Sequence, residues 1–124
     1  MRDIQNRADL EFLMKEFYNK MLVDEKVGYI FTAIAKLDLD HHLPLLVDFW
    51  MNSLFHVGGY KNNVTQIHRD LNAKETLTPE HFQQWLYLFN ETVDNHYQGE
   101  MVEKMKLRAN QIAMTIRAKL GHYS

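Results

Sequence analysis

The stretch from Leu43 to Phe55, LPLLVDFWMNSLF, is apolar on nearly every side when it is drawn as a helix. Pro44 suits the first turn of that helix, because the N–H group that proline lacks would have no partner within the helix there. A helix that is apolar all round is buried on several sides, or it lies against a large apolar ligand. The fold must therefore surround this segment with other helices, with a bound apolar group, or with both.

Three other stretches carry apolar residues at the three-and-four spacing of amphipathic helices. The first runs over 10–22. The second follows residues 78–80, Thr-Pro-Glu, which combine a capping residue, a proline at the first helical position and an acid in the first turn. Its apolar face extends over 82–97. The third covers 105–120 and ends at Gly121, which is placed as a C-terminal cap.

The segments between these helices are short. Residues 36–40 are polar enough for a loop, Gly58-Gly59 ends the apolar helix, and a short helix is expected around Val64 to Leu71. The sequence shows neither the alternation of a strand nor an internal repeat. We therefore expect an all-α fold with about four substantial helices, in a single domain over 1–124.

Length, charge and composition exclude several classes of function. The chain has 124 residues, a formal net charge of −2 and no cysteine. There is no basic excess for a nucleic acid, and no thiol for disulfides, thiolate metal sites or nucleophilic catalysis. The first residues lack an apolar signal region, and no apolar run approaches the roughly 18 residues of a membrane span. We expect a cytoplasmic monomer with no membrane or nucleic-acid partner.

Seven histidines make a metal site worth considering, although the zinc-protease pattern His-Glu-x-x-His is absent. Five of them have polar flanks or lie at helix ends and are expected on the solvated surface: His41, His56, His81, His96 and His122. His68 differs, because Ile67 and Leu71 give its short helix an apolar side. A neutral imidazole can be the sole protein ligand of a haem iron, since the porphyrin supplies four more. On spacing alone, a buried core histidine is the simpler interpretation.

Tyr18 and Trp85 lie on the apolar faces of two predicted helices, and His42 lies near the start of a third. Each carries a polar group that needs a partner when it is buried. From the pattern alone, the two aromatic residues are ordinary core residues and His42 is a surface histidine. A common cavity for all three, faced by His68, is the alternative that the pattern leaves open.

Linked spacings over roughly residues 9–118 resemble the truncated haemoglobins, and most closely their group III branch, a group of bacterial globin-like haem proteins. Phe31 stands thirteen residues after Tyr18, Trp50 stands eight after His42, and His68 stands eight after Tyr60. The remaining matches are Phe17 beside Tyr18, Leu22, Asp24, Leu46, and Phe82-x-x-Trp85-Leu86. The short first helix and paired glycines typical of the other groups are missing on the N-terminal side.

The resemblance implies a two-over-two helical sandwich around protoporphyrin haem, with His68 as the iron ligand. Four apolar residues are then expected to pack on the porphyrin: Phe31, Leu46, Trp50 and Leu86. At the pocket mouth, Tyr60 and a cation, Arg69 or Lys61, are expected to meet the propionates. On the other side of the iron, Tyr18, His42 and Trp85 are expected to donate hydrogen bonds to a bound gas, with His42 acting as a movable gate.

The resemblance implies that the iron binds oxygen or another small ligand, namely nitric oxide, carbon monoxide or cyanide. An alternative is a haem enzyme with nitric oxide dioxygenase or peroxidase-like activity. Because the sequence has no reductase domain and no nucleotide motif, such a cycle needs an external reductase. A haem-free helical interaction module is the third alternative.

Overall fold

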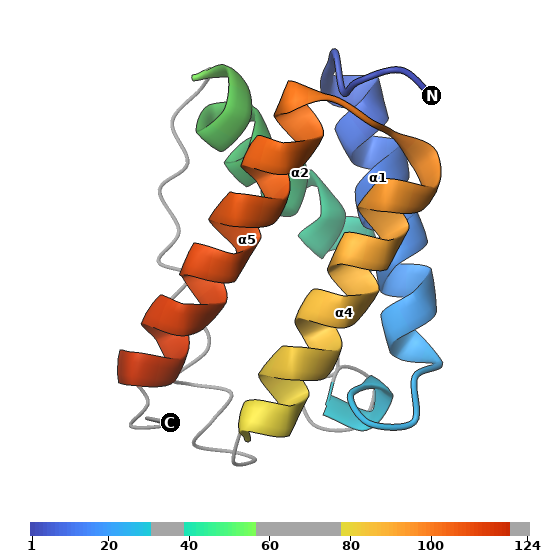
Figure 1. Ribbon diagram of the computed structural model, residues 1–124. Helices are drawn as coiled ribbons and strands as arrows, with labels where there is room; N and C mark the ends of the chain where they lie inside the picture. The colour runs from blue at the N-terminus through green and yellow to red at the C-terminus, as the bar shows by residue number, and fades with distance from the viewer. Residues whose placement is uncertain (31–38, 57–77, 120–124) are drawn as a thin grey trace.

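The computed structural model describes residues 1–30, 39–56 and 78–119, and four α-helices account for most of this described part (Figure 1). They are α1 (Arg7–Leu22), α2 (Leu39–Phe55), α4 (Pro79–His96) and α5 (Glu100–Lys119). The three ranges contain no strand. The predicted all-α fold class is confirmed.

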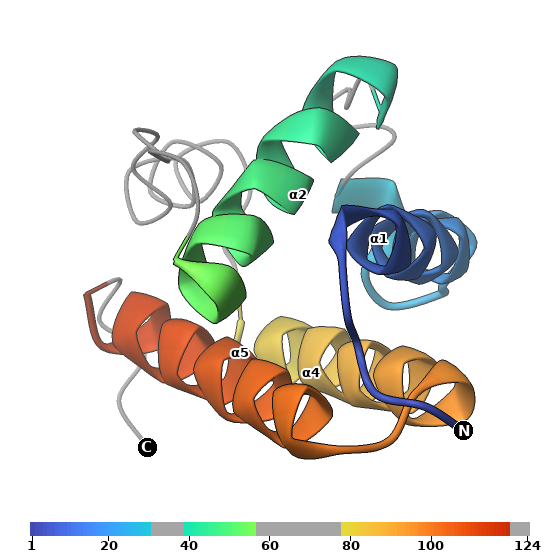
Figure 2. The same ribbon diagram turned by 90° about the horizontal axis from the view of Figure 1, so that it is seen from above.

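The helices form two layers, as Figure 2 shows: α1 and α2 lie over α4 and α5. Helix α1 packs on α2 and on α4, and α5 packs on α4 and on α2. This is the two-over-two sandwich that the resemblance implied. Within the described ranges, no helix combines the length and the apolar character that crossing a membrane requires.

Helix α1 begins where the sequence provides a cap. The Asn6 side chain accepts a hydrogen bond from the Asp9 backbone N–H at 3.1 Å, which satisfies one of the free donors of the first turn. The expected apolar face is buried against the other helices: Leu10, Leu13, Met14, Phe17, Tyr18 and Met21. The helix ends at Leu22, the last residue of the predicted apolar run.

Helix α2 is longer at its N-terminal end than the sequence suggested. It begins at Leu39, so the loop predicted over 36–40 is wrong for its last two residues, and Pro44 lies inside the helix. The extra turn is stable because Asp40 is an acid near the positive end of the helix dipole. Pro44 has no N–H to bond the Asp40 carbonyl, and Asp40 itself is exposed. The helix ends at Phe55, where His56 takes a left-handed φ of 58°, before the predicted stop at Gly58.

Both helices of the second layer have their N-termini satisfied by side chains. At α4, Thr78 Oγ1 accepts from His81 N, and His81 Nδ1 accepts from Thr78 N at 3.1 Å, so a histidine completes the capping box. At α5, the residue before the helix is Gly99, which has no side chain that could cap the helix. The Asp3 carboxylate instead accepts from Met101 N at 2.9 Å and Val102 N at 3.1 Å. A Cβ atom at Gly99 would lie 2.4 Å from Asp3 Cγ, so the close approach requires glycine.

The centre of the sandwich is aromatic. The Phe17 ring meets the rings of Tyr18, Trp85 and Phe89 edge-on, with centroids 5.4, 5.7 and 5.1 Å away. Phe89 in turn stacks on Trp85 and on Trp50 at 5.5 Å each. Three helices therefore meet through contacts of rings that bury large areas and prefer these offset and edge-on geometries.

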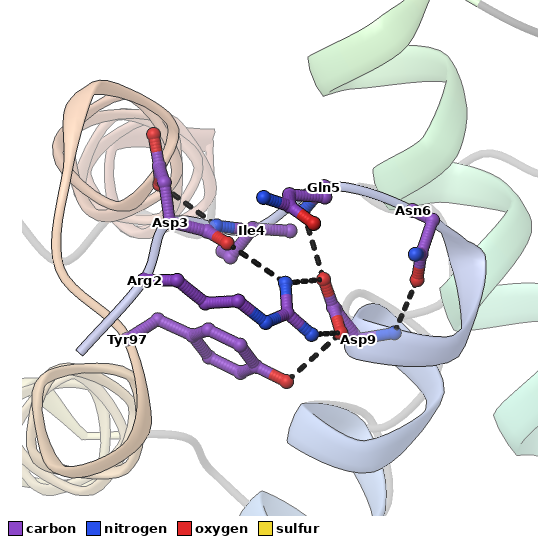
Figure 3. Close-up of polar contacts among 7 residues, drawn as sticks. All are labelled: Arg2, Asp3, Ile4, Gln5, Asn6, Asp9 and Tyr97. Carbon is purple, nitrogen blue, oxygen red and sulfur yellow. Dashed lines mark hydrogen bonds and ion pairs between the residues drawn. The ribbon is translucent and has the colours of Figure 1, made fainter.

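The first residues of the chain are tied to the core by a buried carboxylate (Figure 3). The Asp9 side chain accepts from the Arg2 guanidinium at 2.6 Å, from Gln5 N at 2.8 Å and from the Tyr97 hydroxyl at 3.1 Å. The Arg2 hydrogen bond is the main cause that lowers the pKa of Asp9 to about 2, against the opposing effect of burial. The arrangement joins α1 to the end of α4 through the N-terminal segment.

Replacing Asp9 by Asn is expected to lower the free energy of unfolding at neutral pH by about 1–2 kcal/mol. This loss is smaller than the pKa shift alone would give, because the Arg2 side chain is half exposed and solvent screens the ion pair. The folded pKa lies below the ordinary value of 3.8, so this stabilisation is complete above pH 4 and is lost as the pH falls towards 2. Urea unfolding at both ends of this pH range measures the loss. As the control, Asp48→Asn breaks an exposed ion pair with Arg7 and should change little. Equal losses in the two variants would contradict the assignment.

Candidate functional site

Two residues that the resemblance assigns to the ligand side of a haem lie together. Tyr18 of α1 and His42 of α2 are within hydrogen-bonding distance, with the hydroxyl oxygen 3.3 Å from His42 Nε2. The two rings meet edge-on at 5.6 Å. Tyr18 is buried and His42 is half-buried, so the imidazole points inward from the edge of the sandwich. A hydroxyl and an imidazole nitrogen can exchange donor and acceptor roles with the histidine tautomer.

The third residue of this set, Trp85 of α4, joins the other two through the aromatic core. Phe17 touches both Tyr18 and Trp85, and Trp85 also stacks on Phe89. The Trp85 side chain remains only partly buried. The structure thus gathers Tyr18, His42 and Trp85, from three helices, around one region of the sandwich.

An apolar surface continues from this region. Leu46 of α2 and Leu86 of α4 are both half-buried and pack against the main apolar core. Trp85, Leu86 and Ile112 also pack against a second, smaller core cluster of Ile30, Phe82, Ala113 and Ile116. Half-buried apolar side chains beside hydrogen-bond donors fit a flat apolar group such as haem, because they retain apolar area that a ligand can still cover.

Trp50, predicted to touch the porphyrin, is only 3% exposed. Its described ring contacts are with Phe49 at 5.1 Å and Phe89 at 5.5 Å. These contacts account for its burial within the protein core. A contact between Trp50 and a porphyrin stays a prediction.

The remaining predicted site residues lie outside the described ranges. They are the iron ligand His68, the porphyrin-packing residue Phe31, and the pocket-mouth residues Tyr60, Lys61 and Arg69. The short helix expected around 64–71 and the predicted cap Gly121 lie outside them as well. The roles of these residues stay predictions.

Two further features of the described part of the chain bear on where a metal ion or a haem could bind. Among the residues that the structure describes, no three His, Cys, Asp or Glu side chains are grouped to hold a metal ion. A cavity of about 460 Å³ lies between the end of α1 and α4, and neither Tyr18 nor His42 lines it. Its lining is largely charged: Lys20, Val23, Asp24, Glu25, Lys26, Gln84, Leu88 and Glu91. Such a lining does not suit an apolar porphyrin.

Several side chains make structural contacts that the sequence did not predict. His41 and His56 are exposed, as expected, but His81 belongs to the capping box and His96 packs edge-on against Phe12 at 4.8 Å. Asp24, which matched the family pattern without an assigned role, accepts a hydrogen bond from Gln84 Nε2 at 2.7 Å. Asp24 and Gly28 indicate a turn after the first helix, but nothing in the sequence indicates the partner Gln84.

Comparison with known proteins gives the family. No family profile matches the sequence. The group 3 truncated hemoglobin ctb of Campylobacter jejuni is 31% identical over 121 residues, which span 95% of this chain and 93% of that protein. The crystal structure of the group III truncated hemoglobin from Campylobacter jejuni superposes with a TM-score of 0.85 at 30% identity. That match covers 100% of this chain and 98% of the other. Likeness in sequence and in fold over almost the whole length leads to one conclusion: the chain belongs to the group III truncated haemoglobins.

Proposed function

We propose that the protein binds haem and, through it, oxygen or another diatomic ligand. The observation that carries the proposal is the Tyr18–His42 hydrogen bond, because it brings together two polar side chains of the predicted ligand site from different helices. Membership of the truncated haemoglobins supports the proposal independently. Haem, when bound, would supply an iron atom that takes up diatomic gases.

The chain's own residues would hold the porphyrin and its ligand. Leu46 and Leu86 would cover the porphyrin, whose burial stabilises by roughly 25 cal/mol for each Å² of apolar area removed from water. His68 would bind the iron. The Tyr18 hydroxyl, the His42 imidazole and the Trp85 indole N–H would donate hydrogen bonds to the gas. His42, half-buried at the edge of the sandwich, would also control access.

The direct test is the absorption spectrum of the purified protein. We expect an intense Soret band, with changes on reduction and again on exposure to carbon monoxide. A haem-free protein that takes up no added haem and shows no such band would overturn the proposal. In that case the helical fold would serve a function other than haem binding.

Replacing Tyr18 by Phe is expected to speed oxygen release by about ten- to a hundredfold. A hydrogen bond to a charged acceptor is worth about 1.5–3 kcal/mol, and a factor of ten corresponds to roughly 1.4 kcal/mol. The buried ring stays in place, so only the hydroxyl is lost. Stopped-flow release of oxygen and of carbon monoxide measures the effect, and carbon monoxide, a weaker acceptor, should change much less.

A matched control for Tyr18→Phe is Tyr87→Phe, which removes the hydroxyl of a tyrosine that is 59% exposed on α4. Release rates should be unchanged in this control. Equal acceleration of oxygen and carbon monoxide release in Tyr18→Phe would mean that packing, and not hydrogen bonding, retains the ligand.

A further inference from the structure

Polar bridges span the space between the C-terminal end of α1 and the middle of α4. The two helices run antiparallel and are joined by Asp24 with Gln84 at 2.7 Å and by Lys20 with Glu91 at 3.3 Å. The 460 Å³ cavity lies between these bridges and counts all four side chains in its lining. The polar bridges therefore line this opening and connect the two helices across it.

Asp24 is firmly attached to the end of α1. Its Oδ1 accepts from the backbone N–H groups of Lys26 at 2.8 Å and Val27 at 3.1 Å, and its carbonyl accepts from Gly28 N at 2.9 Å. The turn is tight, because a Cβ atom at Gly28 would lie 2.8 Å from the Leu22 carbonyl oxygen. These contacts leave Oδ2 directed at the Gln84 amide. A fixed turn thus presents one carboxylate oxygen to α4.

The hydrogen bonds around Asp24 favour its ionised form. Burial tends to raise the pKa of the Asp24 carboxyl, but hydrogen bonds from Gln84, Lys26 N and Val27 N outweigh burial and hold the pKa below its ordinary value. The Gln84 amide therefore bonds to a carboxylate, which makes the hydrogen bond stronger than one between neutral groups. The neighbouring charges Lys20, Lys26, Glu25 and Glu91 line the same cavity.

Gln84 immediately precedes Trp85. Successive residues of an α-helix point about 100° apart, so a bond that holds Gln84 on one side fixes how far the helix is rotated at this turn. The described ring contacts of Trp85, with Phe17 and Phe89, are apolar and tolerate sliding. The Asp24–Gln84 hydrogen bond is directional, so it restricts the rotation of α4 at this turn more sharply than the ring contacts do.

We propose that Asp24 and Gln84 are positioning residues that fix the rotation of α4 and thereby the placement of the Trp85 indole. The positioning itself is a property of the fold. Its consequence for gas binding rests on the proposed function, in which the indole N–H faces the ligand. Loosening the pair should then weaken, without abolishing, the hydrogen bond from the Trp85 indole to the bound gas, and should speed oxygen release by about two- to tenfold.

The test reverses the polarity of the pair. Gln84→Glu sets two carboxylates against each other, and adding Asp24→Asn restores one amide–carboxylate hydrogen bond with donor and acceptor exchanged. Gln83→Glu, at the neighbouring exposed position, adds the same charge without touching Asp24. The Trp85 indole N–H signal is followed by NMR in full-length protein reduced under carbon monoxide. Comparison with Trp85→Phe tells it apart from the signal of Trp50, the other tryptophan.

We expect the Trp85 signal to move in Gln84→Glu, to return in the double variant and to stay in place in Gln83→Glu. An unmoved signal in folded Gln84→Glu, or one that the double variant fails to restore, overturns the proposal. If Gln84→Glu does not fold, Gln84→Met removes the donor at similar length, and its signal should move as well. A signal that follows the expected pattern while oxygen release stays constant supports the positioning and instead refutes the role of Trp85 in ligand binding.

Discussion

The His68→Ala protein is expected to lose most of its haem and, with it, the Soret band of a histidine-ligated iron. Because one protein ligand holds the metal in this proposal, no other side chain replaces the lost bond. A ligand present at a thousandfold excess over its Kd stabilises the folded state by about 4 kcal/mol, so unfolding should become easier by a comparable amount. Haem content per chain, the absorption spectrum and urea unfolding measure the result.

The control for this experiment is His56→Ala, which removes an exposed histidine at the end of α2. Haem content and stability should stay close to those of the parent protein. If the His68→Ala protein keeps a normal histidine-ligated spectrum, another residue binds the iron and the assignment is wrong. If both variants lose haem equally, the loss reflects general instability.

Truncating Phe17 to alanine is expected to lower the free energy of unfolding by about 3–5 kcal/mol, the usual cost of removing a buried phenylalanine ring. Phe17 is 2% exposed and touches Tyr18, Trp85 and Phe89, so the change opens a void where α1 meets α4. Urea unfolding followed by circular dichroism gives the free energy. If the variant is unfolded in water, Phe17→Leu provides the measurement, with an expected loss of about 1.5 kcal/mol.

Phe12→Ala is the matched control, because Phe12 lies on the same helix, is 43% exposed and contacts His96. Its loss should be under about 1 kcal/mol, since nearly half of the residue already faces water. Equal losses at the two positions would show that Phe17 is not central to the packing. The comparison separates burial from the loss of an aromatic ring as such.

Local sequence signals predicted the helices well, because caps and apolar spacing act within a few residues. The Thr78-Pro79-Glu80 start and the break after Leu22 are confirmed. The start of α2 was misplaced, since a polar first turn reads as a loop until the rest of the helix anchors it. Boundaries of this kind depend on tertiary packing, which no window of sequence contains.

The grouping at the candidate site required information beyond periodicity. The pattern placed Tyr18 and Trp85 on apolar faces, but only the resemblance to truncated haemoglobins placed His42 beside Tyr18. The Asp9–Tyr97 and Asp24–Gln84 hydrogen bonds join residues 88 and 60 positions apart. A polar residue beyond the end of an apolar run gives no sign of its distant partner, so these bonds could not be predicted from the sequence.

The cap of α5 by Asp3 bears on the order in which the chain folds. Asp3 and Met101 are 98 positions apart, so during synthesis the acceptor leaves the ribosome long before the helix that needs it. We therefore expect the cap of α5 to form late, after the intervening helices have brought Asp3 next to the first turn of α5. Hydrogen exchange at the Met101 and Val102 amides should report this docking directly, and a bulky extension fused next to residue 2 should weaken their protection.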